Sequence, residues 1–251
     1  MNGLSLLGAL NVDSREWEVF SLPPPNTKDY LSMAIASHFR AVAEEHGFAR
    51  WKTRDFARIR NGLLQFMNFQ SSSHGTRDFC VNYSTIPLFM PHQSLGWIVG
   101  GRFPRGKSAD GWWGSKTLEQ TERSAGEIAK VFGGPIVDWF ERTSSLEGMI
   151  RELSQSSKWL NAHADFSRGC CLAMLGRRQD ALAAVAAARA EFDDAHQGAP
   201  DVKWLAEYVS HCRQLIGAIG DKTESELLGR WQRETVANLK LRPITTADPN
   251  G

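Results

Sequence analysis

Amide side chains interrupt two stretches of the chain in which the alternation of apolar and polar residues predicts β-strands. Asn68 and Gln70 fall on one face of the first stretch, and Asn82 falls on the face of the second that also carries Cys80 and Ser84. A buried amide without a hydrogen-bond partner costs about 1–3 kcal/mol, so these side chains must bind a partner group or face water. We predict that they form a polar patch that binds a ligand or a partner strand. The alternative is that they fix strand ends or lie on a solvated face, which is common in antiparallel sheets.

Cationic side chains lie near these amides in the sequence. Arg58 and Arg60 precede them and Arg102 follows two glycines, and their guanidinium groups would hold an anion at the patch. Further cations alternate with aromatic residues, as in surfaces that bind single-stranded nucleic acids: Arg50, Trp51, Lys52, Arg54 and Phe56. A solvated face that guards an edge strand explains the same pattern. The charge balance favours this second explanation, because 29 Lys and Arg against 28 Asp and Glu leave a net charge of +1.

Trp112 and Trp113 lie between glycines and polar residues in a predicted loop. Exposed tryptophans anchor protein interfaces, because they bury a large area with few rotatable bonds. We expect this pair to belong to a binding surface, or else one of the two rings to close the open face of the sheet.

The sequence lacks the motifs of metal sites and of nucleophilic catalysis. One group of thiols and imidazoles comes nearest to a metal cluster, but without the paired spacing of a structural zinc site: His163, Cys170, Cys171, His211 and Cys212. Together with Cys80, the cysteines fit buried, reduced thiols better than a disulfide framework. There is no nucleophile elbow, no H-E-x-x-H and no phosphate-binding loop motif. We therefore predict no catalytic residue, no metal and no cofactor.

The composition is that of a globular protein, since 42% of the 251 residues are apolar. No apolar run reaches the length of about 18 residues that a membrane-spanning helix needs. The apolar stretch Leu4–Leu10 has no Lys or Arg before it, unlike a secretory signal. We expect a cytoplasmic protein that does not bind membranes.

The chain divides into four predicted parts. Residues 1–25 form an N-terminal arm that ends in Pro23–Pro25, which can neither continue a helix nor join a central strand. Residues 26–155 form an α+β domain and residues 156–242 form an all-α C-terminal helical bundle. Residues 243–251 form a disordered tail.

Within the α+β domain we predict a helix packed on a small antiparallel sheet. The helix follows a capping pair, Asn26 and Asp29, and ends at Gly47. Asn61–Gly62 is a strong signal for a two-residue hairpin turn. The predicted strands are 55–60, 63–70, 78–84 and 95–103, the last kinked at Gly100–Gly101, and residues 104–116 are a predicted loop.

From residue 117 onward the apolar spacing is helical. Gly133–Pro135 ends the first of these helices, and Ser144 with Glu147 caps the second. The remaining predicted helices are 161–175, 178–196, 201–220 and 223–240.

Two of these helices have the spacing of a tetratricopeptide-type hairpin. Gly169, Leu172, Ala181 and Ala188 provide the small residues that let the helices approach closely. The sequence shows one such unit, whereas solenoids need about three or more repeats, so we predict a hairpin and not an array.

Several short motifs in the α+β part resemble one family. They are His46-Gly47-Phe48, Asn68-Phe69-Gln70, Phe79-Cys80-Val81-Asn82, Arg102, Trp112 or Trp113, and the stretch from Trp139-Phe140-Glu141 to Leu146-Glu147. Over residues 28–155 the chain resembles the bacterial domain of unknown function 4304 family. The resemblance implies an α+β domain without an established catalytic residue. Small bacterial families of this kind often neighbour toxin genes as immunity proteins, which is an analogy of context.

We therefore expect a non-enzymatic bacterial protein that binds another protein. More specifically, we expect an immunity protein that neutralises a partner toxin. The predicted binding residues are Asn68, Gln70, Asn82, Arg58, Arg102, Trp112 and Trp113. The first alternative is a small-molecule-binding or enzymatic domain, which would need a closed pocket of several hundred Å³ on the polar sheet face. The second, less favoured, is a nucleic-acid-binding module, which the near-zero net charge opposes.

Overall fold

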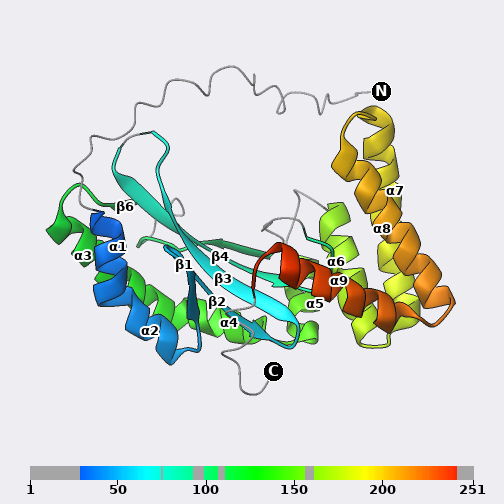
Figure 1. Cartoon of the computed structure of the whole chain (residues 1–251), viewed down its shortest axis with the longest axis horizontal. Coiled ribbons are helices and arrows are strands. Elements are labelled where there is room, and N and C mark those ends of the chain that lie inside the picture. Colours follow the sequence, from blue (N-terminus) through cyan, green and yellow to red (C-terminus); the bar gives the residue numbers. More distant parts are fainter. Residues whose placement is uncertain (1–28, 75, 93–98, 107–110, 156–160, 242–251) are drawn as a thin grey trace.

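The computed structural model describes residues 29–74, 76–92, 99–106, 111–155 and 161–241. It contains a six-stranded antiparallel sheet with helices on one face, followed by C-terminal helices (Figure 1). The predicted α+β class is confirmed. The predicted N-terminal arm and C-terminal tail lie outside the described residues. Among the described helices, none combines the length and hydrophobicity that crossing a bilayer requires.

Five strands follow one another across the sheet in chain order. They are β1 (Ala49–Lys52), β2 (Asp55–Arg60), β3 (Leu63–Ser71), β4 (Asp78–Pro87) and β5 (Val99–Arg102). Asn61 and Gly62 join β2 to β3 with φ of 52° and 72°, the positive values that the predicted hairpin turn requires.

A sixth, short strand replaces part of the loop predicted over 104–116. This strand, β6 (Trp113–Gly114), pairs with Asp78 and Phe79 of β4. The prediction of a continuous loop is wrong here because Trp113 buries its ring in the core, which brings its backbone beside β4.

The first helical segment is bent. Helices α1 (Tyr30–Ala34) and α2 (Arg40–Glu45) are joined by a π-helical turn, η1 (Ile35–Phe39). Asp29 is the N-cap, since its carboxylate accepts a hydrogen bond from the Ser32 amide at 3.1 Å. The other predicted capping residue, Asn26, lies outside the described residues. Gly47 follows the helix with φ of 78°, as predicted.

The second helical segment is kinked at its predicted stop. Helix α3 (Leu118–Val131) continues into a π-helical turn, η2 (Phe132–Ile136), and then α4 (Val137–Arg142), with the non-helical angles absorbed at Gly134. The following helix, α5 (Leu146–Gln155), begins after Ser145, whose hydroxyl accepts from the Gly148 amide at 3.1 Å. The predicted cap, Ser144, instead donates to the Glu141 carbonyl at 2.7 Å.

Helices α1 to α4 cover one face of the sheet (Figure 1). The strand residues on this face belong to the main core and include Phe56, Met67, Phe69, Phe79 and Val81. Burial of these side chains is the main force that fixes the strand register, because a shift of one residue would turn every side chain to the other face.

The C-terminal helices are α6 (Asn161–Met174), α7 (Arg178–Gly198), α8 (Lys203–Gly220) and α9 (Glu224–Asn238). Figure 1 shows α7 and α8 side by side, while α9 crosses towards the sheet. The core is continuous between the two parts: Phe89 and Met90, which follow β4, belong to the same buried cluster as Phe166 and Trp231. The four cysteines are buried and free, as predicted.

The predicted hairpin of α6 and α7 gives a test of packing. A Cβ at Gly169 would lie 2.3 Å from Val185 Cγ2, so Gly169→Ala is expected to lower the free energy of unfolding by about 1–3 kcal/mol. Adding Val185→Ala makes room for the new methyl group, so the double variant should lose less than the two single losses combined. Urea unfolding measures this coupling. Strict additivity would show that the two helices are not in close contact.

Candidate functional site

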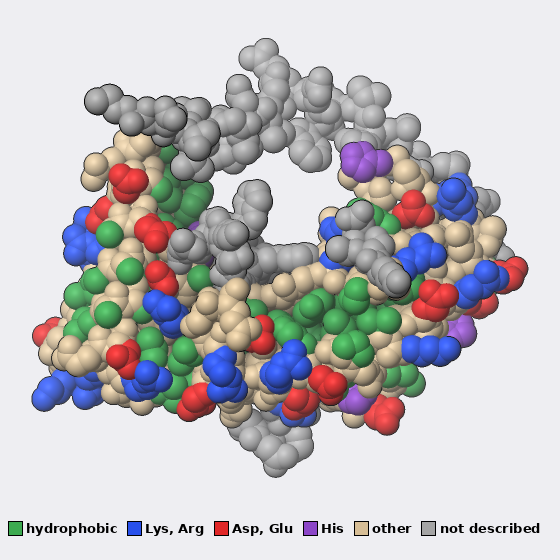
Figure 2. Space-filling view, turned by 180° about the vertical axis from the view of Figure 1, so that it is seen from behind, with side chains coloured by type: hydrophobic (Ala, Val, Ile, Leu, Met, Phe, Trp, Pro, Cys, Tyr) green, Lys and Arg blue, Asp and Glu red, His purple; other side chains and the backbone are tan. Residues whose placement is uncertain are grey.

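The face of the sheet opposite α1 to α4 carries the predicted amides. In Figure 1 this face points upward, into the space between the β3–β4 hairpin and the upright helices α7 and α8. Figure 2 shows from behind that the surface of the described residues is hollowed between these two parts. We call the sheet face at the base of this hollow the cradle floor.

Asn82 is the centre of a hydrogen-bonded network on this floor. Its side-chain amide donates to Gln70 Oε1 at 2.9 Å, and its Oδ1 accepts from Arg102 Nε at 3.4 Å and from the Cys80 thiol at 3.6 Å. Both polar atoms of the Asn82 side chain therefore have a partner although the residue is only 2% exposed, whereas Gln70 is exposed. Asn68 lies directly opposite Asn82 in the β3–β4 register.

Arg102 connects this network to a tryptophan. It lies opposite Asn82 in the β4–β5 register, and its guanidinium lies 4.9 Å from the centre of the half-buried Trp112 ring. Such a cation–π contact orders both side chains. We call the set Asn68, Gln70, Asn82, Arg102 and Trp112 the amide patch.

Asn68 is held at the border of the patch by a neighbouring carboxylate. Its side-chain amide donates to Asp55 Oδ1 on β2, and both residues are partly buried. The amides of the patch thus hydrogen-bond to one another and to the flanking strands. The structure shows what the alternative interpretation expected: the amides connect neighbouring strands, and Gln70 is exposed at the surface.

Arg58 does not join the amide patch, and the expectation that it would is wrong. It lies on the helix-covered face, where it donates to Gln65 Oε1 at 2.7 Å, to the His46 carbonyl at 2.7 Å and to Glu141 Oε1 at 2.8 Å. The guanidinium lies 4.5 Å from the Phe48 ring centre. Burial lowers the pKa of the Arg58 guanidinium from its usual value, and Glu141 opposes that shift. Arg58 therefore ties β2 to α4 inside the fold.

Trp113 is likewise not at the surface. It is 2% exposed and packs in the main core, while the guanidinium of Arg105 lies 5.5 Å from its ring centre. Of the predicted tryptophan pair, only Trp112 lies on the cradle side of the sheet. The two rings separate because Trp113 begins β6 with its side chain in the core, whereas Trp112 precedes the strand and contacts Arg102.

The cations around β1 are engaged with carboxylates and carbonyls of the same region. Arg54 contacts Asp29 at 2.9 Å, and Arg60 contacts Glu141 at 3.3 Å. The strand register is irregular between Arg50 and Lys52, and Arg50 Nε donates to the Lys52 carbonyl at 3.4 Å. A bulge with flanking cations guards an edge strand against further pairing.

The thiols are poor nucleophiles and poor ligands. Burial raises the pKa of Cys80, of Cys170 and of Cys171, and it raises the pKa of Cys212 to about 12. Within the described ranges, no group of three or more His, Cys, Asp or Glu side chains is arranged to hold a metal ion.

A shallow depression lies away from the amide patch, beside α2 and β1. Its volume is about 390 Å³, and it is lined by Arg40, Glu44, Gly47, Phe48, Ala49 and Arg50. The small-molecule alternative requires a closed pocket on the polar sheet face. This depression is open and lies away from that face.

The partners of Arg58 were not predicted from the sequence. Gln65 alternates with Leu64 and Phe66, so it faces the helices, and the Asn61–Gly62 turn places it opposite Arg58 in the β2–β3 register. Those two signals together identify a buried polar pair. Glu141 had no such signal, because it comes from a helix 83 residues away from Arg58 in the chain.

The comparison with family models agrees with the motifs. Residues 39–142 match the model described as Domain of unknown function (DUF4304). Over these residues the chain is similar to the DUF4304 family. The DUF4304 match includes all six strands and both partners of the Arg58–Glu141 ion pair, and it leaves α5 to α9 outside. No curated protein and no solved structure matches the chain.

Proposed function

We propose that this protein binds another protein, without catalysis, through the amide patch. The observation that supports this most directly is the ordered chain of side chains from Trp112 through Arg102 and Asn82 to the exposed Gln70. Trp and Arg are the side chains most often found at the energetic centres of protein interfaces. Because these side chains are already held in place, little conformational entropy is lost when a partner binds.

The specific form of the proposal is a bacterial immunity protein that neutralises a toxin in the cytoplasm. It is supported by the DUF4304 match together with the analogy of family context, and by buried cysteines without disulfides. A toxin gene beside the gene of this protein would identify the partner to be tested.

Binding of that partner should weaken when the patch is changed. We expect Trp112→Ala and Arg102→Ala each to raise the Kd at least about 10-fold, which corresponds to about 1.4 kcal/mol, as measured by isothermal titration calorimetry. Trp204→Ala is the matched control, because Trp204 is 45% exposed on α8. Trp113→Ala is unsuitable, since it would disturb the core.

Unchanged binding by the patch variants would contradict the proposal. If Trp112→Ala and Arg102→Ala fold normally and bind the partner as tightly as the wild type, the amide patch is not the interface. A loss confined to Trp204→Ala would place the interface on the C-terminal helices instead.

A further inference from the structure

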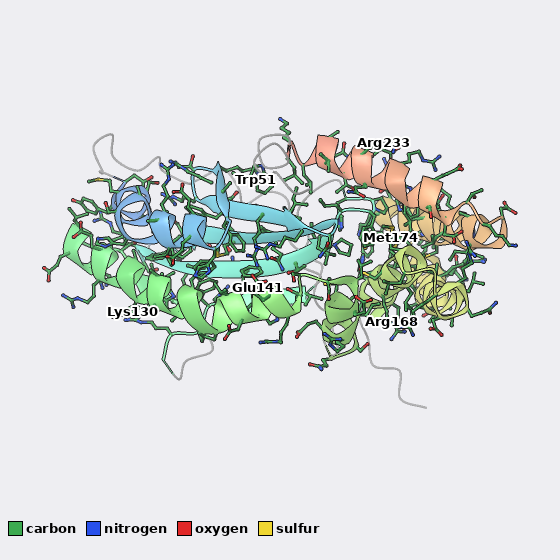
Figure 3. The ribbon with its side chains drawn as sticks, turned by 90° about the horizontal axis from the view of Figure 1, so that it is seen from below. Trp51, Lys130, Glu141, Arg168, Met174 and Arg233 are labelled. Atoms are coloured by element: carbon green, nitrogen blue, oxygen red, sulfur yellow. The ribbon has the colours of Figure 1, made fainter. Side chains whose placement is uncertain are left out.

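The end of the cradle floor next to the amide patch is apolar and covered by the chain's own C-terminal turn. The residues after α9 form a tight turn in which the Leu239 amide donates to the Thr235 carbonyl and the Leu241 amide donates to the Val236 carbonyl. We call Thr235–Leu241 the C-terminal latch. It packs on an apolar strip of the sheet formed by Ala57, Leu64, Phe66, Ile86 and Leu88. Trp51 of β1 borders this cluster and is seen beside the strands in Figure 3.

The latch is hydrogen-bonded to the segment that follows β4. Thr235 Oγ1 donates to the Met90 carbonyl at 2.6 Å and accepts from the His92 amide at 3.1 Å. The side-chain amide of Asn238 donates to the His92 carbonyl at 3.3 Å. His92 is therefore bonded to the latch through both of its backbone groups.

The imidazole of His92 is buried beside these hydrogen bonds. It is 6% exposed, and its Nε2 lies 3.2 Å from the Pro87 carbonyl, so the neutral ring donates its proton to that oxygen. Burial lowers the pKa of His92 from 6.5 to about 4, the Pro87 carbonyl opposes the shift and the His163 imidazole adds to it. From α9, Thr235 and Asn238 bond to the backbone of His92 and carry no charge, and from α6 the His163 imidazole acts on the ring.

His163 belongs to an aromatic cluster on the helices. Its ring centre lies 4.4 Å from that of Tyr208, 4.9 Å from that of Phe192 and 5.5 Å from that of Trp204. Burial also lowers the pKa of His163. The group that faces His92 from α6 is thus a second imidazole, which would repel an imidazolium and cannot neutralise it.

We propose that the C-terminal latch is an acid-released cover, which protonation of His92 detaches so that the apolar strip beside the amide patch is uncovered. The strip and the patch lie on the same sheet face, so release would extend the surface offered to a partner. That a partner binds the uncovered strip rests on the proposed function. The release itself is a property of the free protein.

The direction of the pH dependence follows from proton linkage. With the latch closed His92 has a pKa of about 4, and with the latch open we expect the ordinary value of 6.5. Between these values the open form binds more protons, so falling pH favours opening. The equilibrium constant for opening should rise about 30-fold between about pH 7.5 and about pH 5.

Hydrogen exchange of the latch amides measures this constant. After correction for the pH dependence of intrinsic exchange, the protection factors of the His92 and Leu241 amides should fall about 30-fold over that range, while that of Met67 in the centre of β3 stays unchanged. In His92→Gln, whose amide can still donate to the Pro87 carbonyl but does not titrate, the fall should be less than about 3-fold. His38→Gln is the matched control, because His38 is exposed.

Two results would overturn the inference. One is an equal fall in wild type and His92→Gln, and the other is a loss of protection at Met67 in step with the latch, which would mean global unfolding. If His92→Gln does not fold, Thr235→Val provides the second test: it removes the hydroxyl that fastens the latch, so protection of the Leu241 amide must already be low at about pH 7.5. Unchanged protection in Thr235→Val would equally reject the latch. None of these measurements uses a partner, so a failed search for a partner rejects the proposed function and leaves the latch to be judged separately.

Discussion

Arg58→Ala is expected to lower the free energy of unfolding by about 2–4 kcal/mol, because it removes a buried side chain that donates hydrogen bonds to buried and partly buried acceptors. Arg58 is 4% exposed and donates to three acceptors, on β3, on α4 and at the end of α2. The truncation leaves the Gln65 Oε1 atom and the His46 carbonyl without this donor, and it opens a void beside the Phe48 ring. Chemical denaturation of the purified protein measures the loss.

Arg60→Ala is the matched control for Arg58→Ala. Arg60 contacts the same carboxylate, Glu141, at 3.3 Å, but the side chains of Arg60 and Glu141 are both 46% exposed. Exposed ion pairs are worth about 0–1 kcal/mol, so this variant should be close to wild type. Equal losses for the two variants would contradict the structural role assigned to Arg58.

Gly100→Ala is expected to cost about 2–5 kcal/mol, which combines overpacking with backbone strain. Gly100 has φ of 153°, and a Cβ there would lie 2.1 Å from the Tyr83 carbonyl oxygen and 2.8 Å from Ser84 Cα. Both obstacles are backbone atoms of β4, so β5 must move away from β4 to make room. Thermal unfolding followed by circular dichroism measures the effect.

The adjacent glycine provides the control for Gly100→Ala. A Cβ at Gly101 would meet the Tyr83 hydroxyl oxygen at 3.2 Å, and that atom is the far end of a side chain that can shift. Gly101→Ala should therefore cost clearly less than Gly100→Ala. If the order were reversed, the close approach of β5 to β4 that brings Arg102 opposite Asn82 would be wrong.

The sequence by itself determined the local elements of the sheet and most of the helices. Asn61–Gly62 specified a turn with two positive φ values, and this turn set the register of β2 against β3. The alternation in β3 and β4 placed Asn68, Gln70 and Asn82 on one face, where the structure brings them together. These features depend on residues close in the chain, whose steric preferences and apolar period act without distant partners.

The tertiary structure alone decided which polar residues are exposed. Arg58 was expected beside the amides, but the β2–β3 register places it opposite Gln65 on the helix-covered face, where it meets Glu141 of α4 and the His46 carbonyl. Trp113 was expected in a loop, and burial against the core turned its backbone into a strand. The core around Trp113 and the Glu141 partner of Arg58 come from residues far away in sequence, and no local pattern records where those residues will lie.

The same reason explains the arrangement of the helices on either side of Gly133–Pro135 and the position of His92. Glycine and proline predict a stop locally, and the backbone is non-helical at Gly134, while burial of Phe132 and Ile136 in the core holds the helices on both sides of this kink. His92 has no distinguishing neighbours in the sequence, and its burial depends on α9, more than 140 residues later. Sequence pattern therefore fixed what each segment can form, while long-range packing fixed which side chains remained available to a partner.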